Sequence, residues 1–174
     1  MLVNILRLLP PETAHQITIK LLKSRLVLHR KKTTDFSTLK QTILGIDFQN
    51  PLGLAAGFDK NAEVIEPMFS YGFGFVEVGT ITPKSQKGNQ KPRIFRLLED
   101  EAIINHLGFN NKGSEKILKN LKEFSEINYN GGVVGINIGK NKSTQNDFDD
   151  YLYCIEKLGS YGNYITINIS SPNT

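Results

Sequence analysis

Short apolar runs alternate with amphipathic stretches along most of this chain. The runs are rich in Val, Ile and Phe, which is typical of buried strands, whereas the stretches between them repeat apolar residues every three or four positions, as helices that cover a sheet do. We expect strands at 52–55, 73–81, 131–139 and 164–170 and helices at 62–72, 113–126 and 144–162. Strands that alternate with helices in this way predict parallel βαβ units.

Two further segments carry the pattern of hairpins. Residues 42–50 predict a small hairpin before the first long strand, and residues 91–105 predict an excursion that turns at Glu99 and Asp100. Polar and glycine-rich motifs follow the four main strands: "AAGFDK", "VGTITP", "NIGKNK" and "NISSPNT". The carboxyl ends of parallel strands are where β/α barrels and doubly wound sheets both place their chemistry. No GxGxxG follows the first strand, which disfavours a dinucleotide fold.

The N-terminus has a different pattern. An apolar helix over residues 2–9 ends at Pro10 and Pro11, and a second helix begins at Pro11 with apolar residues at helical spacing as far as Leu28. Basic residues decorate it and follow it. Two amphipathic helices with a basic collar fit a segment lying in a membrane interface, and they equally fit a helical hairpin packed on the main domain. No stretch of the sequence reaches the roughly 20 apolar residues that span a bilayer.

Composition excludes several functions. The net charge of +4 comes from lysines spread along the chain near acids, without the basic strip and interleaved aromatics of a nucleic-acid groove. His15, His29 and His106 have no metal-ligand spacing, so we expect no metal site. The single cysteine, Cys154, lies within a helical pattern, which predicts a small core residue rather than a nucleophile.

The residues at the strand ends suggest chemistry on a flat heterocycle. Small residues in "AAGFDK" allow a ring to approach the backbone, and Lys60 lies just beyond them, as a Schiff-base nucleophile, an electrostatic partner for an anion or a surface ion pair with Asp59. Amides both donate and accept hydrogen bonds, which suits an imide-like ring. Four amides lie at strand ends or in the excursion: Asn105, Asn137, Asn168 and Asn173. Ser171 is a candidate proton relay if the site is dry.

Six motifs in order carry a resemblance that covers the whole chain. "NPLGLAAGFDKN", "GFGFVEVGTITP", "GNQKPRIFRL", "INHLGFNNKG", "GINIGKNK" and "YITINISSPNT" resemble the membrane-bound, quinone-using class 2 of dihydroorotate dehydrogenases. The resemblance implies a (β/α)8 TIM barrel that binds FMN and oxidises (S)-dihydroorotate to orotate in pyrimidine synthesis. We expect about the first four βα units to be present in residues 41–174, preceded by a two-helix amphipathic segment over residues 1–40.

The same resemblance implies roles for individual residues. Ser171 would be the catalytic base, in place of the cysteine of the soluble class. The implied substrate contacts are Lys60, Asn105, His106, Leu107, Gly108, Phe109, Asn168 and Asn173, with Phe109 covering the ring. The implied FMN contacts are Ala56, Gly57, Phe58, Asp59, Lys60, Thr80, Asn137 and Asn168. His15 and Arg96 would line a quinone tunnel at the membrane surface. His106 stands where many relatives carry arginine, a departure that concerns the charge beside the substrate loop.

Several expectations follow for the whole molecule. The resemblance favours a peripheral protein on the cytoplasmic side of a bacterial inner membrane. Because a complete barrel needs ~250 residues, we expect a truncated chain that alone neither retains FMN nor turns over. The alternatives are an aldolase-like barrel that forms an imine through Lys60, and a non-catalytic half-barrel from a split gene.

Overall fold

A parallel sheet of four strands forms the centre of the computed structural model, which describes residues 6–24, 37–127, 129, 131–169 and 171. In spatial order the strands are β3 (Gly53–Leu54), β4 (Phe75–Ile81), β7 (Val133–Ile138) and β8 (Tyr164–Ile167). Each neighbouring pair is parallel, with Gly53 opposite Phe75, Phe75 opposite Val133 and Gly135 opposite Tyr164. The four predicted strands and their parallel order are therefore confirmed.

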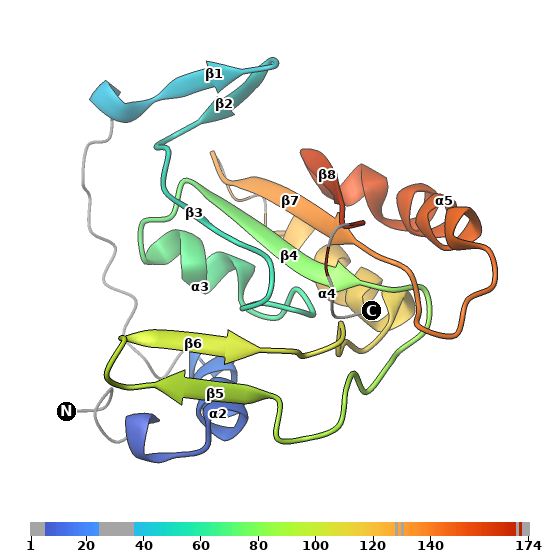
Figure 1. The fold of residues 1–174 in the computed structure, drawn as a ribbon. Coiled ribbons are helices and arrows are strands. Elements are labelled where there is room, and N and C mark those ends of the chain that lie inside the picture. The colour runs from blue at the N-terminus through green and yellow to red at the C-terminus, as the bar shows by residue number, and fades with distance from the viewer. Residues whose placement is uncertain (1–5, 25–36, 128, 130, 170, 172–174) are drawn as a thin grey trace.

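Three helices alternate with these strands and cover one face of the sheet (Figure 1). They are α3 (Ile65–Ser70), α4 (Ser114–Ser125) and α5 (Asp147–Leu158), the last followed by the 3-10 turn η2 (Gly159–Tyr161). The side chain of Asn146 accepts a hydrogen bond from the Phe148 N–H and so caps the start of α5. Each helix returns the chain to the same end of the sheet, so the four strands run in one direction and their carboxyl ends lie together.

The hydrophobic core lies between the sheet and these helices. Strand residues such as Val76, Val78 and Ile136 are fully buried against Ile117 of α4. Cys154 of α5 is also fully buried, and this burial raises the pKa of its thiol to about 12. A thiol with that pKa is almost entirely protonated near neutral pH, and its complete burial confirms the prediction of a small core residue.

Two antiparallel hairpins extend from the sheet at opposite ends (Figure 1). β1 (Gln41–Ile43) and β2 (Ile46–Phe48) follow the 3-10 turn η1 (Ser37–Leu39). β5 (Ile94–Leu97) and β6 (Ala102–Asn105) form the predicted excursion, with Ile94 opposite Asn105. The second hairpin begins and ends near the carboxyl ends of the strands, and it therefore delivers Asn105 to the end of the sheet where chemistry is expected.

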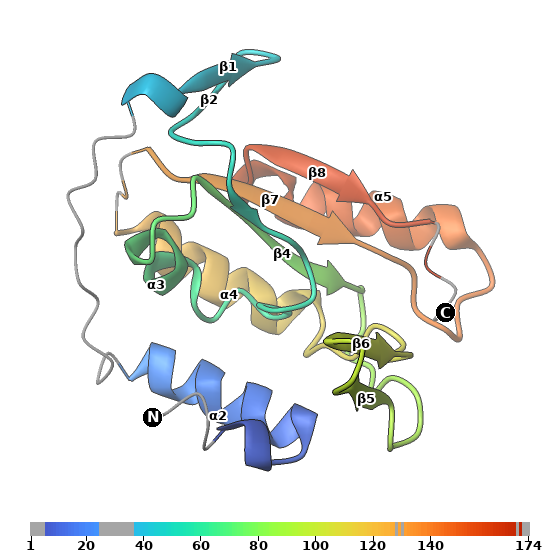
Figure 2. The same ribbon diagram turned by 60° about the vertical axis from the view of Figure 1, so that its left-hand side comes forward.

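Helix α2 (Pro11–Lys23) lies beside β5 and beneath α3 and α4 (Figure 2). Its Ala14, Ile19 and Leu22 are buried, and the last two belong to the same core cluster as the strands. The expected start at Pro11 is confirmed, and residues 6–8 of the first predicted helix are helical, whereas residues 2–5 of that helix and the continuation of the second from residue 25 to Leu28 fall outside the described residues. Among the residues that the structure describes, no helix combines the length and apolar content needed to cross a bilayer.

Candidate active site

A cavity of about 450 Å³ opens at the carboxyl ends of the four strands, and we call it the sheet-end cavity. Residues of β4 and β7, of the segments that follow β3 and β8, and of the end of β6 and the segment after it line the cavity: Ala55, Ala56, Gly57, Lys60, Glu77, Thr80, Asn105, Leu107, Gly108, Phe109, Asn137, Asn168 and Ser171. Its volume lies within the range of small-molecule sites. Most residues that the sequence placed in the candidate site therefore share one cavity.

Backbone is exposed on the side of the cavity that follows β3. Gly57 has φ +113°, which L-residues rarely adopt, and a Cβ placed there would have no atom within 4 Å. Ala55 and Ala56 add only methyl groups. This surface is flat and open, so it satisfies the steric requirement for a planar ring that stacks against the backbone.

Hydrogen bonds between polar side chains form the floor of the cavity. The Thr80 hydroxyl donates to Asn137 Oδ1 at 2.6 Å, and Asn168 Nδ2 donates to Thr80 Oγ1 at 3.0 Å. Asn137 Nδ2 donates to Glu77 Oε1 at 2.8 Å. Thr80 and Asn137 are buried, so their side chains are held in fixed orientations before any ligand arrives.

Lys60 supplies the positive charge of the site. Its side chain is half-buried and forms no ion pair with a carboxylate of the described residues. Burial lowers the pKa of its ammonium, the charge of Arg93 lowers it further, and Glu12 partly opposes both effects. A cation that is desolvated without a bound partner is poised to attract an anionic ligand into the cavity.

The segment that follows β6 forms the lid side of the cavity. Gly108 and Phe109 both have positive φ (71° and 49°), which turns the chain sharply and places the Phe109 ring inside, at 8% exposure. Asn111 Nδ2 holds this turn by donating to the Phe109 carbonyl at 2.8 Å. The expected position of Phe109 over a bound ring is compatible with this geometry.

Some predicted site residues turn elsewhere. The His106 ring stacks on Phe95 at 6.0 Å between ring centroids and does not line the cavity, so the ring lies on the hairpin surface. Asp59 is buried, and its carboxylate accepts the Glu63 and Val64 N–H groups at 2.8 Å each. Phe58 packs against the core cluster. A role for Phe58 or Asp59 in binding the cofactor would have to use the backbone. Asn173 lies outside the described residues.

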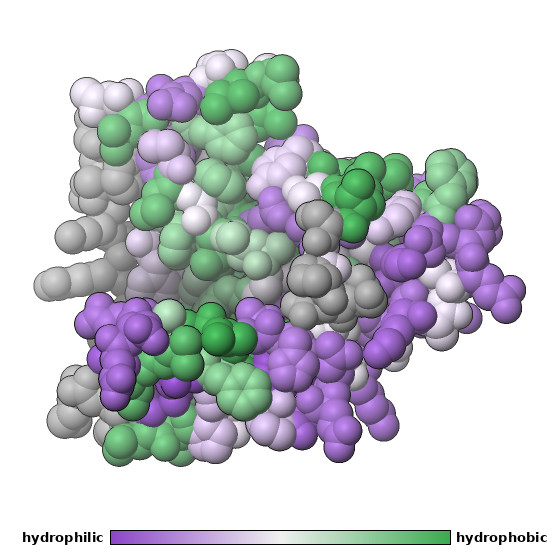
Figure 3. Space-filling model, viewed as in Figure 1, coloured by the Kyte–Doolittle hydropathy of each residue, from purple (hydrophilic) through white to green (hydrophobic). Residues whose placement is uncertain are grey.

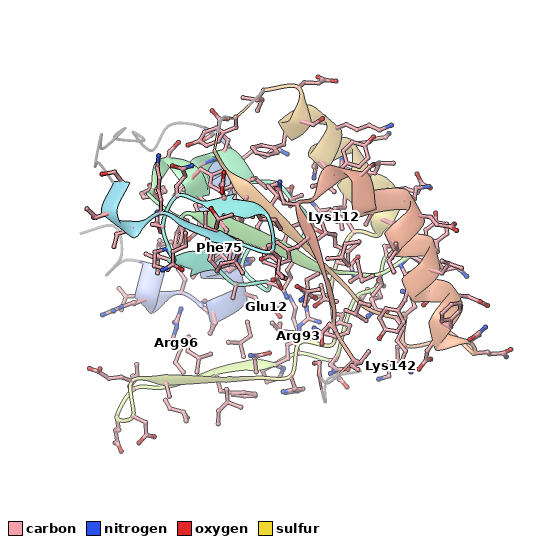
Figure 4. The ribbon with its side chains drawn as sticks, turned by 90° about the horizontal axis from the view of Figure 1, so that it is seen from above. Glu12, Phe75, Arg93, Arg96, Lys112 and Lys142 are labelled. Atoms are coloured by element: carbon pink, nitrogen blue, oxygen red, sulfur yellow. The ribbon has the colours of Figure 1, made fainter. Side chains whose placement is uncertain are left out.

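A second cavity of about 250 Å³ lies between α2 and the β5–β6 hairpin, and we call it the α2–hairpin cavity. His15 and Arg96 both line it. A His15 ring nitrogen, Nε2, donates to the Phe58 carbonyl at 2.6 Å, because a carbonyl oxygen only accepts. Arg96 donates to the carbonyls of Arg7 and Leu9 at 2.8 Å each and so holds the residues just before α2; Figure 4 shows its side chain extending from the hairpin.

The two cavities share a wall. Four residues line both of them: Gly57, Lys60, Asn105 and Leu107. Arg93 ties this wall to α2, because its guanidinium bonds the Glu12 carboxylate on one side and the Leu107 carbonyl on the other. Figure 4 shows Glu12 and Arg93 meeting between α2 and the start of β5.

Sequence reasoning missed Glu77 and the Glu12–Arg93 pair. Glu77 had a detectable signal, because a carboxylate inside the apolar strand "FVEVGTI" is costly unless it has partners in a polar interior. Glu12 and Arg93 lie 81 positions apart and had none.

The fold and the cavity define the chain as part of a β/α-barrel protein whose candidate ligand site lies at the carboxyl ends of its strands. The sequence profile of the family "Dihydroorotate dehydrogenase" matches residues 38–174, and the chain belongs to that family. It is 52% identical over 167 residues to the dihydroorotate dehydrogenase (quinone) of Rhizobium etli, which covers 96% of this chain and 45% of that protein.

Other relatives agree. The dihydroorotate dehydrogenase (quinone) of Idiomarina loihiensis is 52% identical over 170 residues, which covers 94% of this chain and 49% of that protein. A crystal structure of the Eimeria tenella enzyme in complex with ferulenol superposes with a TM-score of 0.89 at 46% identity, over 94% of this chain and 45% of that one. The chain thus spans about half the length of the curated relatives it matches.

Proposed function

We propose that this chain forms the substrate-binding half of an FMN-dependent dihydroorotate dehydrogenase that reduces a quinone. One observation carries the proposal: Ser171, Lys60 and Asn105 come from three separate segments and line one cavity. The names of the relatives supply the substrate and the acceptor, and the reaction converts (S)-dihydroorotate and quinone into orotate and quinol as part of pyrimidine synthesis.

The residues of the sheet-end cavity fit a flavin. Its ring would stack on the open backbone at Ala56 and Gly57, and its polar edge would meet Thr80, Asn137 and Asn168. These residues would hold the flavin, which would supply the hydride-acceptor chemistry for C6 of dihydroorotate and the electron transfer to the quinone. The network on the cavity floor holds the amides in place before binding, which reduces the entropy lost on ordering the site.

The chain's own residues account for substrate binding and proton removal. Lys60 pairs with the carboxylate of dihydroorotate, because it is the half-buried cation of the cavity and has no ion-pair partner among the described carboxylates. As Ser171 takes the C5 proton, its own hydroxyl proton passes on to water at the mouth of the cavity. A hydroxyl is a weak base, so it needs the exclusion of water that Phe109 and the residues around it provide over the ring.

The decisive experiment separates the two half-reactions in the full-length protein. We expect Ser171→Ala to slow the reduction of FMN by dihydroorotate by ~10²–10⁴, which is what loss of a general base typically costs. Reoxidation of the reduced flavin by quinone should stay within about twofold of wild type, since it needs no proton from C5. Stopped-flow absorbance of the flavin measures both rates. Equal losses in both would assign Ser171 a structural role and count against the proposal.

The α2–hairpin cavity supports a quinone site lined by His15 and Arg96. We propose that the quinone enters from a membrane surface that α2 and the hairpin approach. Phe95, Ile103 and Ile104 of the hairpin are each more than 40% exposed, and Figure 3 shows apolar surface over this hairpin. An exposed apolar patch of this kind marks an interaction site. We propose a peripheral location on the cytoplasmic face of an inner membrane.

Substitutions test this site better than deletion, because α2 belongs to the hydrophobic core. We expect His15→Ala to raise the KM for a long-chain quinone about tenfold or more while the reduction of FMN by dihydroorotate is unchanged. Gln16→Ala, on the same helix and lining the same cavity, is the matched control for the loss of side-chain volume. Unaltered quinone kinetics in the His15 variant would remove the cavity from the acceptor path.

A further inference from the structure

Glu77 is the one carboxylate lining the sheet-end cavity among the described residues, and sequence reasoning assigned it no role. It lies in the middle of β4, half-buried, with both oxygens engaged. Asn137 Nδ2 bonds Oε1 at 2.8 Å, while the hydroxyls of Tyr164 and Thr166 bond Oε2 at 3.1 and 3.0 Å. It is therefore the terminus of the polar network that continues through Asn137 to Thr80 and Asn168.

A carboxylate can only accept hydrogen bonds, and this fixes the direction of every bond in the network. Asn137 must turn its NH₂ group toward Glu77, which leaves its Oδ1 facing Thr80. The single hydroxyl hydrogen of Thr80 then goes to Asn137, so Thr80 Oγ1 can only accept from Asn168. Burial and the nearby Glu77 raise the pKa of Tyr164, so this phenol also remains a donor to the carboxylate.

The orientation of Asn168 follows from this order. Its NH₂ group donates to Thr80 Oγ1 at 3.0 Å and lies 3.4 Å from Asn137 Oδ1. Its Oδ1 receives no hydrogen bond from the described residues and remains available to a ligand in the cavity. If Glu77 were a group that could also donate, the two amides and the Thr80 hydroxyl could reverse together, and Asn168 would present its NH₂ group instead.

We propose that Glu77 is a positioning residue that makes Asn168 a hydrogen-bond acceptor and thereby selects ligands that present a ring N–H. The inference rests on the proposed function for the identity of the ring, a pyrimidinedione carboxylate. Glu77 acts through Asn137 and Thr80 and makes no contact with the substrate. The selection is by polarity: an N–H facing Asn168 is bound, and a group without that hydrogen would cover the half-buried amide oxygen and leave it unpaired.

The test compares ligands in the full-length, FMN-loaded protein. The probes are orotate and its two ring N-methylated analogues, and the dissociation constants are read from the change in flavin absorbance. We expect wild type to bind orotate more tightly than the analogue methylated at the nitrogen that Asn168 meets. Glu77→Gln should weaken the binding of orotate by roughly 5- to 100-fold, the range for one polar group that a ligand buries without a partner. The affinity for the methylated analogue should stay nearly unchanged. The discrimination ratio would then collapse.

A double variant provides a rescue that a purely structural role would not predict. Glu77→Gln with Asn137→Asp moves the carboxylate one step along the network. The new carboxylate at position 137 again accepts from Thr80 and Asn168, and the amide at position 77 can donate to it. We expect discrimination to return to within about threefold of wild type. Asn137→Asp alone would place two carboxylates side by side, which disfavours ionisation of both, and should bind orotate poorly.

Tyr164→Phe is the matched control, because it removes a donor to Oε2 and leaves the bond between Oε1 and Asn137 intact. It should keep the discrimination ratio. If Glu77→Gln does not fold, Thr80→Val tests the same order by cutting the network between Asn137 and Asn168, and should also abolish discrimination. Wild-type discrimination in Glu77→Gln or Thr80→Val, with orotate still bound, would overturn the inference and leave the proposed function standing. Failure of wild type to bind orotate would instead overturn the proposed function.

Discussion

Arg93 links three parts of the molecule, and its removal should release helix α2. The side chain is 6% exposed and bonds both oxygens of Glu12, and it also donates to the carbonyls of Lys87 at 2.6 Å, Asn89 at 2.8 Å and Leu107 at 3.4 Å. Glu12 lies in the first turn of α2. Arg93→Met keeps most of the side-chain volume but leaves a carboxylate and these carbonyls without their charged donor.

The size of the effect follows from this geometry. Removing one partner of a buried ion pair typically costs ~3–5 kcal/mol. Lys91 also reaches Glu12 at 2.6 Å and offsets part of the loss, although it is 62% exposed and so contributes little itself. We therefore expect a value near the lower limit, about 3 kcal/mol in the free energy of opening α2, which corresponds to roughly a hundredfold increase in its opening equilibrium.

Hydrogen–deuterium exchange of the α2 amides, measured by mass spectrometry, is the direct assay. Exchange over α2 should accelerate about a hundredfold in Arg93→Met and less in Arg93→Lys, which keeps the charge but loses the planar fork. The amides of α5, which precedes the strand β8 at the opposite edge of the sheet from β3, serve as the internal control. Protection of α2 within about threefold of wild type in Arg93→Met would refute the reasoning, as would equal acceleration over α2 and α5.

The same pair gives a pH dependence with a defined sign. Partial burial would raise the pKa of Glu12, but hydrogen bonds from Arg93 and Lys91 outweigh it, and the net effect lowers the pKa below its ordinary value of 4.5. A lowered carboxyl pKa contributes stability that is present above pH 4.5 and is lost as the pH falls through the folded-state pKa. Protection of α2 should therefore decline in that acidic window in wild type and be nearly flat there in Arg93→Met.

Two further predictions concern the cavity and the core. Because the pKa of Lys60 is lowered, the affinity of the full-length protein for orotate should begin to fall at a pH below the ordinary lysine value of 10.5. In a titration from pH 7 to 10, Lys60→Met should bind orotate weakly and independently of pH. Identical pH profiles for the wild type and the variant would contradict the assignment. Gly74→Ala would place a Cβ 2.2 Å from the Asn50 carbonyl oxygen and should cost ~1–3 kcal/mol in urea unfolding. Gly159→Ala, where the nearest atom is the end of Ile165 at 3.3 Å, is its control and should change stability little; equal effects would show that the steric argument fails.

The fold could be predicted because its elements are encoded locally. "GGVVGINIG" is buried along the whole of β7, and the acidic first turn and Asn146 cap mark the start of α5. The helix predicted from Ala62 begins only at Ile65, because Asp59 accepts the N–H groups of Glu63 and Val64 and holds that stretch in a turn. Such side-chain capping is decided by three-dimensional position, which periodicity does not report.

The candidate site could be predicted in part for the same reason. Lys60, Asn137, Asn168 and Ser171 each follow or end a strand, and parallel strands bring such ends together without any long-range information. The resemblance implied that His106 contacts the substrate together with Asn105, but alternate residues of an extended segment face opposite sides, and the His106 ring stacks on Phe95. Sequence neighbours of a site residue are thus poor guides to which side chains enter the cavity.

The shared wall of the two cavities makes the proposed function testable as a whole. Ser171 lines only the sheet-end cavity and His15 lines only the α2–hairpin cavity, whereas Lys60 and Asn105 line both. If substrate and quinone occupy opposite sides of this wall, Ser171 substitutions should affect only the first half-reaction and His15 substitutions only the second. Substitutions of Lys60 or Asn105 should then affect both, because no change in such a residue leaves one cavity untouched. A wall residue whose loss impaired a single half-reaction would mean that the two ligands meet elsewhere.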